Sequence, residues 1–338
     1  MKKRQLGSTS LFVTELSFGG ASIGNLYNRC TNEAALETLS ASWDLGIRYF
    51  DTAPEYGNGL SEHRMGNMLR DRPRDQYILS TKVGDLLYAI HNQIPLSNKF
   101  IDQLPFHLMY DYSYEGVMRG FEDSLQRLGL NQIDILLVHD LDPIIHDQEY
   151  FLHHFKTYMD SGYKALTKLR EEGIIKAIGL GVKQWEVCAE AMKHGDYDCF
   201  MLQGNYTLLE QPALSGFMDD CIKKRISILL AGPYASGILA TGPIKGAYFH
   251  HTEADECILK RVQRIQDICH SYNTPIQAAA IQFPLHHPAI TSVVVGSASA
   301  QSMRDNVNYL TFNVPLVLWE ELKSAGIISK QAPISDML

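Results

Sequence analysis

The sequence predicts an α/β protein in which eight parallel strands, each followed by a helix, close into a (β/α)8 barrel of the TIM type. Short apolar runs alternate with longer amphipathic stretches, which is typical of parallel strands covered by helices. A glycine followed by an apolar residue recurs where a helix would meet a strand, at Gly46, Gly129 and Gly173. The count of eight strand-like runs favours a closed barrel over an open doubly wound sheet.

The elements follow in order along the chain. Residues 2–13 hold a Gly-Ser-Thr-Ser turn between short extended pieces, and we expect a β-hairpin there that plugs the bottom of the barrel. The expected strands are residues 15–18, 47–50, 77–81, 133–138, 175–180, 200–202, 226–231 and 290–295. Thr31 would cap the first main helix and Gly46 would end it. Apolar residues share one face in two predicted helices, namely Leu36, Leu39 and Trp43, and Val117, Phe121, Leu125 and Leu128.

Length and composition describe an ordinary globular chain. The 338 residues are 45% hydrophobic and 20% charged, which excludes disorder and collagen-like repeats. The length allows two average domains, but one barrel also fits, and we expect a single barrel domain over residues 1–338. The formal net charge of −8 argues against nucleic acid and anionic lipid as partners.

The sequence also predicts where the protein works. Residues 1–6 are basic, but the apolar core of a signal peptide does not follow them. No run reaches the roughly eighteen apolar residues of a membrane span. The six cysteines are scattered singly, without a C-x-x-C pair. We therefore expect a cytoplasmic protein with free thiols and no membrane partner.

Three connections are too long for plain turns, and all of them follow strands: residues 84–112, 140–160 and 232–254. Loops after strands form the C-terminal rim of a barrel, where active sites lie. Aromatic residues in the first two connections favour pocket walls over disorder, and they are Tyr88, Phe100, Phe106, Tyr110, Tyr112, Tyr150, Phe151, Phe155 and Tyr158. The three long connections should therefore mark one functional face.

Ionisable residues stand where three neighbouring strands should emerge into that rim. They are Asp51 and Tyr56 after the second strand, Lys82 after the third and His139 after the fourth. Each alone is more often a salt-bridge partner or a structural residue, but their strands converge on one mouth. A lysine held by an aspartate would lower the tyrosine pKa from about 10 towards working pH. His139 would hydrogen-bond the reacting oxygen, so the set suits proton transfer paired with hydride transfer.

The motifs around these residues resemble the aldo-keto reductase signature. The matching segments are Tyr49-Phe50-Asp51-Thr52-Ala53-Pro54-Glu55-Tyr56-Gly57, Ser61-Glu62, Gly66, Ser80-Thr81-Lys82 and Leu137-Val138-His139. The resemblance covers Leu6 to Asn306 and implies the same eight-stranded barrel. By this resemblance Asp51, Tyr56, Lys82 and His139 are the catalytic tetrad, with Tyr56 as the acid/base.

The resemblance also implies an extended nicotinamide dinucleotide bound across the rim. The loop and helix start after strand eight would hold its pyrophosphate and adenosine, because amides at a helix N-terminus donate to phosphate oxygens. Gln203 matches the glutamine that contacts the nicotinamide carboxamide, and residues 232–237 match the loop over the pyrophosphate. The residues assigned to the cofactor are Asp51, Gln203, Gly232, Pro233, Tyr234, Gly237, Gly296, Ser297, Ser302 and Asn306.

The residues near the expected adenosine end favour NAD over NADP. Family members that prefer NADPH place Lys or Arg at the positions of Gly296 or Ser302, where a cation pairs with the 2′-phosphate. Both residues are uncharged here, and Arg304 is the nearest residue that would reverse the preference. The nicotinamide end departs from the family, because Gly181-Val182 replaces a common Ser-Asn pair and Ala231 stands where an aromatic ring often stacks.

One branch of the family is similar in further segments, namely Val138-His139-Asp140, Gly162-Tyr163-Lys164-Ala165-Leu166, Gly179-Leu180-Gly181-Val182 and residues 232–239. This branch holds sugar 1-dehydrogenases acting on L-fucose, L-galactose or other D-threo-aldoses, and pyridoxal 4-dehydrogenase. The branch oxidises a cyclic hemiacetal to a lactone with NAD. By this resemblance Tyr56 would act as base on the anomeric hydroxyl.

Several alternatives stay open at this point. A general NADPH-dependent aldehyde or ketone reductase fits the same tetrad, and so does a cofactor-sensing subunit like the family's potassium-channel partners. The aromatic loop residues would stack on a sugar or on pyridoxal, and the residues offered for hydroxyl groups are His107, Asp111, His146, His153 and His154. Three adjacent histidine pairs lack a partner at ligand spacing, so no metal is expected. No exposed apolar stripe predicts an oligomeric interface.

Overall fold

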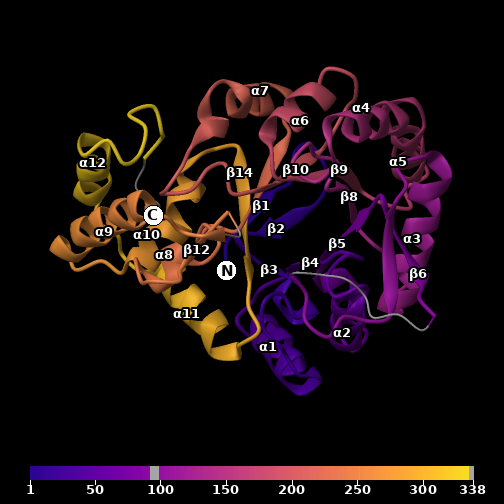
Figure 1. Cartoon of the computed structure of the whole chain (residues 1–338), viewed down its shortest axis with the longest axis horizontal. Coiled ribbons are helices and arrows are strands. Elements are labelled where there is room, and N and C mark those ends of the chain that lie inside the picture. The colour runs from indigo at the N-terminus through magenta and orange to yellow at the C-terminus, as the bar shows by residue number, and fades with distance from the viewer. Residues whose placement is uncertain (92–98, 251, 335–338) are drawn as a thin grey trace.

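The computed structural model describes residues 1–91, 99–250 and 252–334, and its central element is a closed barrel of eight parallel strands (Figure 1). The strands follow one another around the barrel in chain order, and the last pairs with the first. They are β3 (Leu16–Gly19), β4 (Tyr49–Asp51), β5 (Ile78–Val83), β8 (Ile135–His139), β9 (Ala177–Val182), β10 (Cys199–Gln203), β11 (Ser227–Ala231) and β14 (Ile290–Gly296). The predicted (β/α)8 barrel is confirmed.

Helices form the outer layer around these strands (Figure 1). They are α1 (Asn32–Asp44), α2 (Leu60–Leu69), α3 (Tyr114–Leu128), α4 (Gln148–Thr157), α5 (Tyr163–Glu171), α6 (Trp185–Ala191), α7 (Phe217–Lys224), α8 (Ile238–Thr241), α9 (Glu256–Ser271), α10 (Ile276–Gln282), α11 (Ala300–Thr311) and α12 (Leu316–Ser324). Shorter turns are η1 (Ser22–Gly24), η2 (Arg74–Gln76), η4 (Pro212–Leu214), η5 (Phe283–His286) and the π-helical η3 (Tyr158–Gly162). The predicted cap is confirmed, since Thr31 Oγ1 accepts a hydrogen bond from the Ala34 amide at 3.2 Å.

The buried face of α1 differs from the prediction. Leu39 and Trp43 are buried, but Leu36 is 49% exposed. The inward face instead carries the hydroxyl residues Thr38 and Ser42, whose side chains donate to helix carbonyls one turn earlier at 2.7 Å. A hydroxyl that is satisfied within its own helix can be buried without a partner elsewhere, so a search for apolar residues alone selects the wrong face. The predicted face of α3 is confirmed, with Val117, Phe121 and Leu128 buried.

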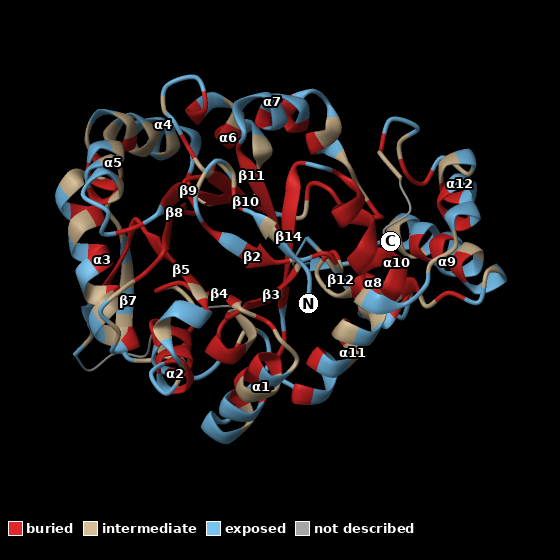
Figure 2. Cartoon of the chain, turned by 180° about the vertical axis from the view of Figure 1, so that it is seen from behind, coloured by how far each residue is buried: buried red, intermediate tan, exposed pale blue. Residues whose placement is uncertain are grey.

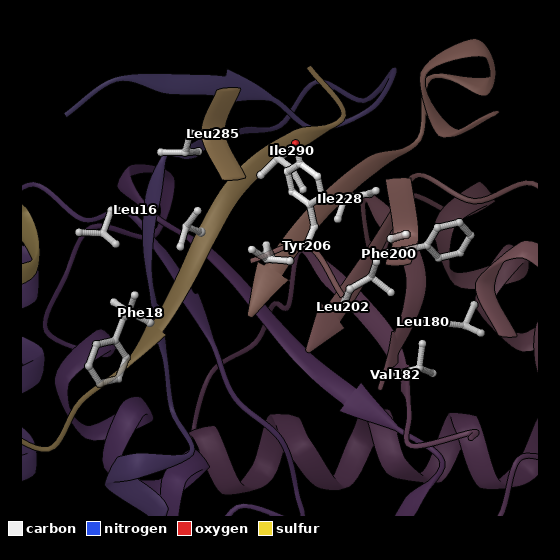
Figure 3. Close-up of a cluster of buried hydrophobic side chains, with 14 of the residues drawn as sticks. Leu16, Phe18, Leu180, Val182, Phe200, Leu202, Tyr206, Ile228, Leu285 and Ile290 are labelled. Carbon is white, nitrogen blue, oxygen red and sulfur yellow. The ribbon is translucent and has the colours of Figure 1, made fainter. Parts of the chain in front are cut away.

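The core has two layers, because side chains alternate across each strand. Leu180, Val182, Phe200 and Leu202 project from neighbouring strands into the layer between barrel and helices (Figure 3). A second cluster fills the barrel itself with Tyr49, Ile135, Leu137, Ala177, Cys199, Met201, Leu229 and Val294. The strands are accordingly buried and the outer helix faces exposed (Figure 2).

An N-terminal hairpin closes one end of the barrel, as predicted. Its strands are β1 (Lys3–Gln5) and β2 (Phe12–Thr14). Leu6, Leu11 and Val13 from this segment join the cluster inside the barrel. The Gly7 amide donates to Ser227 Oγ, at the start of β11, at 2.7 Å. The hairpin therefore seals the end where the strands begin and leaves the other end for chemistry.

The three long connections carry elements that the sequence did not predict. The first folds into the antiparallel pair β6 (Asp85–Ala89) and β7 (Phe106–Tyr110). The second contains α4, and the third contains α8 with the short pair β12 (Tyr248–Phe249) and β13 (Thr252–Glu253). Residues 92–98 and 251 of the predicted connections lie outside the described residues.

Two further predictions concern the whole chain. All six cysteines are free, as expected, and five of them are buried. Within residues 1–91, 99–250 and 252–334, no helix has the length and apolar character that a membrane crossing needs.

Candidate active site

A buried ion pair joins the ends of β4 and β5. Lys82 Nζ contacts Asp51 Oδ1 and donates to the Thr52 carbonyl oxygen at 3.0 Å. Ser80 Oγ donates to the same Asp51 oxygen at 2.5 Å. Charge-assisted hydrogen bonds of this kind are stronger than neutral ones, so the Lys82 ammonium is fixed at the mouth of the barrel.

Tyr56 and His139 stand beside this pair, so the structure brings the four predicted residues together. The Tyr56 ring meets the His139 ring edge-on, with centroids 5.8 Å apart and an interplanar angle of 82°. Lys82 Nζ lies 5.9 Å from the centroid of the Tyr56 ring. Three neighbouring strands and the loop after β4 therefore bring a phenol, a cation and an imidazole to one place.

The acidity predicted for Tyr56 is wrong in direction. Burial raises the pKa of Tyr56 well above 10, and the carboxylates of Asp51, Glu55, Asp140 and Asp85 add to the rise. The Lys82 ammonium does not reverse this, since its contacts are to Asp51 and the Thr52 carbonyl. The phenol consequently holds its proton in this state.

Asp85 is a partner of the site that sequence reasoning missed. Its Oδ2 atom lies 2.5 Å from His139 Nδ1, and both side chains are buried. Burial opposes charge on His139, but Asp85 and Asp140 more than offset it, so the pKa of His139 is raised. Asp85 stands three residues after Lys82, so extending the strand-end criterion past Gly84 would have found it.

The His139 backbone is held as firmly as its ring. Tyr112 Oη donates to the His139 carbonyl oxygen at 2.8 Å and lies 3.1 Å from His146 Nε2. The His146 ring in turn packs edge-on against Tyr110, with centroids 4.6 Å apart. Tyr112 and His146 were expected to bind ligand. In the structure Tyr112 instead holds the His139 backbone, and His146 contacts Tyr112.

Two further carboxylates approach His139 from the loops. Ligand atoms of Glu55, His139 and Asp140 all lie within 4.8 Å of one another. Lys99 Nζ pairs with Glu55 at 3.0 Å, and Lys183 Nζ pairs with Asp140 at 2.6 Å. Such a set could ligate a metal, which the sequence did not predict, but each carboxylate already has an ammonium partner that would repel a dication.

Several residues of the signature motif hold neighbouring elements together. Ser61 Oγ donates to the Gly20 carbonyl at 2.8 Å. The Glu62 carboxylate is fully buried between Arg127, at 2.5 Å, and the Thr81 hydroxyl, at 2.8 Å. A Cβ atom on Gly66 would lie 2.0 Å from the Leu128 carbonyl oxygen. These residues fasten α2 to α3 and β5, and so hold the Tyr56 loop in place.

The residues assigned to the cofactor's phosphate end gather around the start of α11. Tyr234 Oη donates to Asn306 Oδ1 at 2.6 Å, which joins the loop after β11 to α11. Ser299 caps the helix by accepting from the Ser302 amide at 3.4 Å, and Ser297 Oγ accepts from the Ser299 amide at 3.0 Å. The first turn of α11 carries no acidic residue. These groups fit a diphosphate at the helix N-terminus.

The remaining assigned residues lie at the ends of β10, β11 and β14. Gln203 ends β10 with an exposed side chain, and Gly232, with φ 68°, turns the chain directly after β11. Gly296 ends β14 and is exposed, whereas Pro233 is buried and Gly237, with φ 99°, precedes α8. These residues border one rim, as an extended ligand would require.

Gly181, where this chain departs from the family pattern, packs closely against Lys82. A Cβ atom on Gly181 would lie 3.2 Å from Lys82 Cε, which is closer than ordinary van der Waals contact. The residue faces the lysine across β8, so a serine at this position would push against the side chain that contacts Asp51. Gly181 therefore makes room for Lys82.

Some aromatic residues of the long connections line the candidate site, and others belong to the hydrophobic core. The Phe100 ring lies 6.0 Å from the Tyr56 ring, as a pocket wall should. Tyr158 is fully buried, with its hydroxyl 3.2 Å from Tyr197, and belongs to the packing of the outer layer. Tyr150 is 62% exposed and His153 is also exposed. Position in a long loop was too coarse a criterion to separate these roles.

Comparisons with known proteins place these observations among relatives. Residues 15–326 match the Aldo/keto reductase family. Pyridoxal 4-dehydrogenase of Microbacterium luteolum is 40% identical over 337 residues, which cover 97% of this chain and 98% of that protein. D-threo-aldose 1-dehydrogenase of a Pseudomonas species is 36% identical over 326 residues, covering 95% and 96%. The holo form of an aldo-keto reductase from Bacillus halodurans has a TM-score of 0.76 at 23% identity, covers 100% and 99% of the chains, and shares the fold.

Proposed function

Because the chain belongs to the aldo/keto reductase family, we propose that it is an NAD-dependent dehydrogenase that oxidises the cyclic hemiacetal of an aldose of the L-fucose or D-threo-aldose class to a lactone. The observation that carries this proposal is the convergence of Asp51, Tyr56, Lys82 and His139 at one mouth of the barrel. The relative named D-threo-aldose 1-dehydrogenase supports the substrate class. The six free cysteines support the expected cytoplasmic location.

Oxidation of a hemiacetal removes a hydride from the anomeric carbon and a proton from the anomeric hydroxyl, leaving a lactone carbonyl. A bound nicotinamide dinucleotide would supply the hydride acceptor. The buried Tyr56 phenol keeps its proton, so it acts as a relay: its oxygen takes the proton of the anomeric hydroxyl while its own proton passes to the bare Nε2 of the neutral His139 imidazole. Asp85 fixes Nδ1 of that imidazole and leaves Nε2 facing the reaction.

The residues around α11 would hold the dinucleotide. Ser297, Ser302 and the helix amides suit its phosphates, and Gln203 suits the carboxamide. The uncharged Gly296 and Ser302 support NAD over NADP, since a 2′-phosphate would meet no cation at either position.

Pyridoxal is the second candidate substrate. The 40% identical relative named pyridoxal 4-dehydrogenase favours it, and the Phe100 ring beside Tyr56 offers a surface on which a pyridine ring would stack. Pyridoxal also closes to a cyclic hemiacetal, so the same proton and hydride transfers apply.

Initial rates of NADH formation at alkaline pH test the proposal. The panel is L-fucose, D-arabinose, L-galactose, D-glucose and pyridoxal, each with NAD and with NADP. Rapid NAD reduction by the sugars, absent in Tyr56→Phe, is the expected result. Rapid reduction by pyridoxal alone would favour the second candidate. NADPH-dependent reduction of aldehydes without hemiacetal oxidation would instead indicate a general reductase, and cofactor binding without any turnover would indicate a sensing subunit.

A further inference from the structure

Two carboxylate–ammonium pairs lie beside His139. Glu55 pairs with Lys99 at 3.0 Å, and Asp140 pairs with Lys183 at 2.6 Å. Asp140 Oδ1 also lies 4.0 Å from His139 Nε2, the ring nitrogen that Asp85 leaves free. The tetrad chemistry uses none of these four side chains.

Asp140 carries a buried acceptor without a partner. The residue is 3% exposed, and its Oδ2 atom has no hydrogen-bond partner among the described residues. Its backbone adopts a φ of 47°, in the left-handed region, and its amide donates to the Gly181 carbonyl at 3.0 Å. A buried carboxylate oxygen left unpaired is costly, so its retention beside His139 points to a ligand that donates to it.

The charges of this cluster narrow the class of ligand. A divalent cation would sit against the ammonium groups of Lys99 and Lys183, and a phosphate would sit against the carboxylates of Glu55 and Asp140. A neutral hydroxyl avoids both conflicts, because it donates to a carboxylate and accepts from an ammonium at once. Two such pairs therefore suit a polyhydroxylated molecule.

We propose that Glu55 and Asp140, with Lys99 and Lys183, form a subsite that binds the hydroxyl group next to the anomeric carbon of an aldose. The proposal rests on the proposed function, which puts the anomeric oxygen at Tyr56 and His139. Neighbouring hydroxyls of a sugar ring lie about one hydrogen-bond length apart. The 2-hydroxyl of a sugar so placed falls beside the His139 neighbours, where Asp140 Oδ2 accepts from it and Lys183 donates to it.

The matched pair L-fucose and 2-deoxy-L-fucose isolates this contact. The readout is the ratio of the two kcat/KM values for NAD reduction, measured with the wild-type protein and with Asp140→Asn. Asparagine keeps the shape and tolerates the left-handed backbone. Any general effect of the substitution on His139 divides out of the ratio, because both sugars undergo the same chemistry. Glu149→Gln, an exposed change in the same connection, is the matched control.

We expect the wild-type protein to prefer L-fucose by about 10-fold to 100-fold, the usual cost of losing a hydrogen bond to a charged group. Asp140→Asn should cut this preference at least about fivefold, within the same range, and Glu149→Gln should keep it. Equal ratios in wild type and Asp140→Asn would overturn the subsite while leaving the hemiacetal dehydrogenase intact.

A second measurement tests the subsite in the case that the protein oxidises no hemiacetal and the proposed function is therefore wrong. L-fucose is then tested as an inhibitor of benzaldehyde reduction by NADH, since benzaldehyde has no hydroxyl group. Inhibition of the wild-type protein that is weakened about 10-fold or more in Asp140→Asn would support the subsite. Absence of inhibition, or equal inhibition in both proteins, would overturn it.

Discussion

His139 Nδ1 lies 2.5 Å from Asp85 Oδ2, and both side chains are buried. A carboxylate accepts hydrogen bonds and cannot donate them, so Nδ1 must carry the proton. The neutral ring is thereby restricted to the tautomer with a bare Nε2, and the charged ring donates from Nε2. Asp85 thus fixes the tautomer of His139 and leaves Nε2 as the ring nitrogen that is available to a ligand.

Asp85→Asn should slow hemiacetal oxidation by about 100-fold to 10,000-fold, because an amide lets the His139 ring take the wrong tautomer.

The pH profile of the Asp85→Asn variant should move as well. Oxidation needs neutral His139, so the rate rises as pH passes upward through the His139 pKa. Asp85, Asp140 and Glu55 raise that pKa, and loss of the Asp85 charge lowers it again. The acidic limb of kcat/KM for NADH formation should therefore shift to lower pH.

The control for this experiment is Asp123→Asn, which neutralises a partly exposed partner of Arg119 on α3. Its profile should superimpose on that of the wild-type protein. A limb that stays in place in Asp85→Asn, with full activity, would show that the Asp85 contact does not govern His139.

The tetrad could be found from the sequence because it follows a rule of topology. Parallel strands of a barrel present their ends at one mouth, so a strand-end position already places Asp51, Lys82 and His139 within reach of one another. Local patterns were enough for the hairpin and for the cap at Thr31. The fold and the centre of the site could thus be predicted, because both depend on local sequence patterns and on the order in which barrel strands follow one another.

The features of the site that could not be predicted from the sequence depend on contacts between loops. Glu55, Lys99 and Lys183 are far apart in the sequence, and only their approach to Asp140 gives them a common role. The acidity of Tyr56 was misjudged for a related reason. Its pKa is raised by burial and by four carboxylates, two of which, Asp85 and Asp140, come from other segments of the chain, whereas the sequence suggested only the nearby lysine.

Gly181→Ala should reduce the rate of NADH formation by about threefold to tenfold, because small displacements of a catalytic group are costly. The added methyl would stand 3.2 Å from Lys82 Cε and displace the lysine that contacts Asp51. Gly120→Ala is the matched control, since its added methyl has no neighbour nearer than 3.6 Å. Equal rates for the two variants would mean that Lys82 tolerates the shift.

Ser302→Arg should improve kcat/KM for NADP by about tenfold, through a charge-assisted contact with the 2′-phosphate. Ser302 is exposed in the first turn of α11, so the new side chain meets no steric obstacle. Asn308→Arg adds the same charge farther along the same helix and should leave the NAD to NADP ratio unchanged. A wild-type preference for NADP that disappears in Arg304→Ala would contradict the assignment and make Arg304 the phosphate ligand.

Glu62→Gln should destabilise the fold by about 3 kcal/mol, the lower range for breaking a buried ion pair. The Glu62 carboxylate has no exposed surface and holds Arg127 at 2.5 Å and the Thr81 hydroxyl at 2.8 Å. A neutral amide leaves the Arg127 guanidinium without its counter-charge between α2 and α3. The midpoint of urea unfolding, followed by tryptophan fluorescence, should fall. Glu190→Gln removes an exposed pair with Lys193 and should leave the midpoint in place. If both variants unfold at the wild-type midpoint, the glutamate serves some purpose other than fastening the Tyr56 loop.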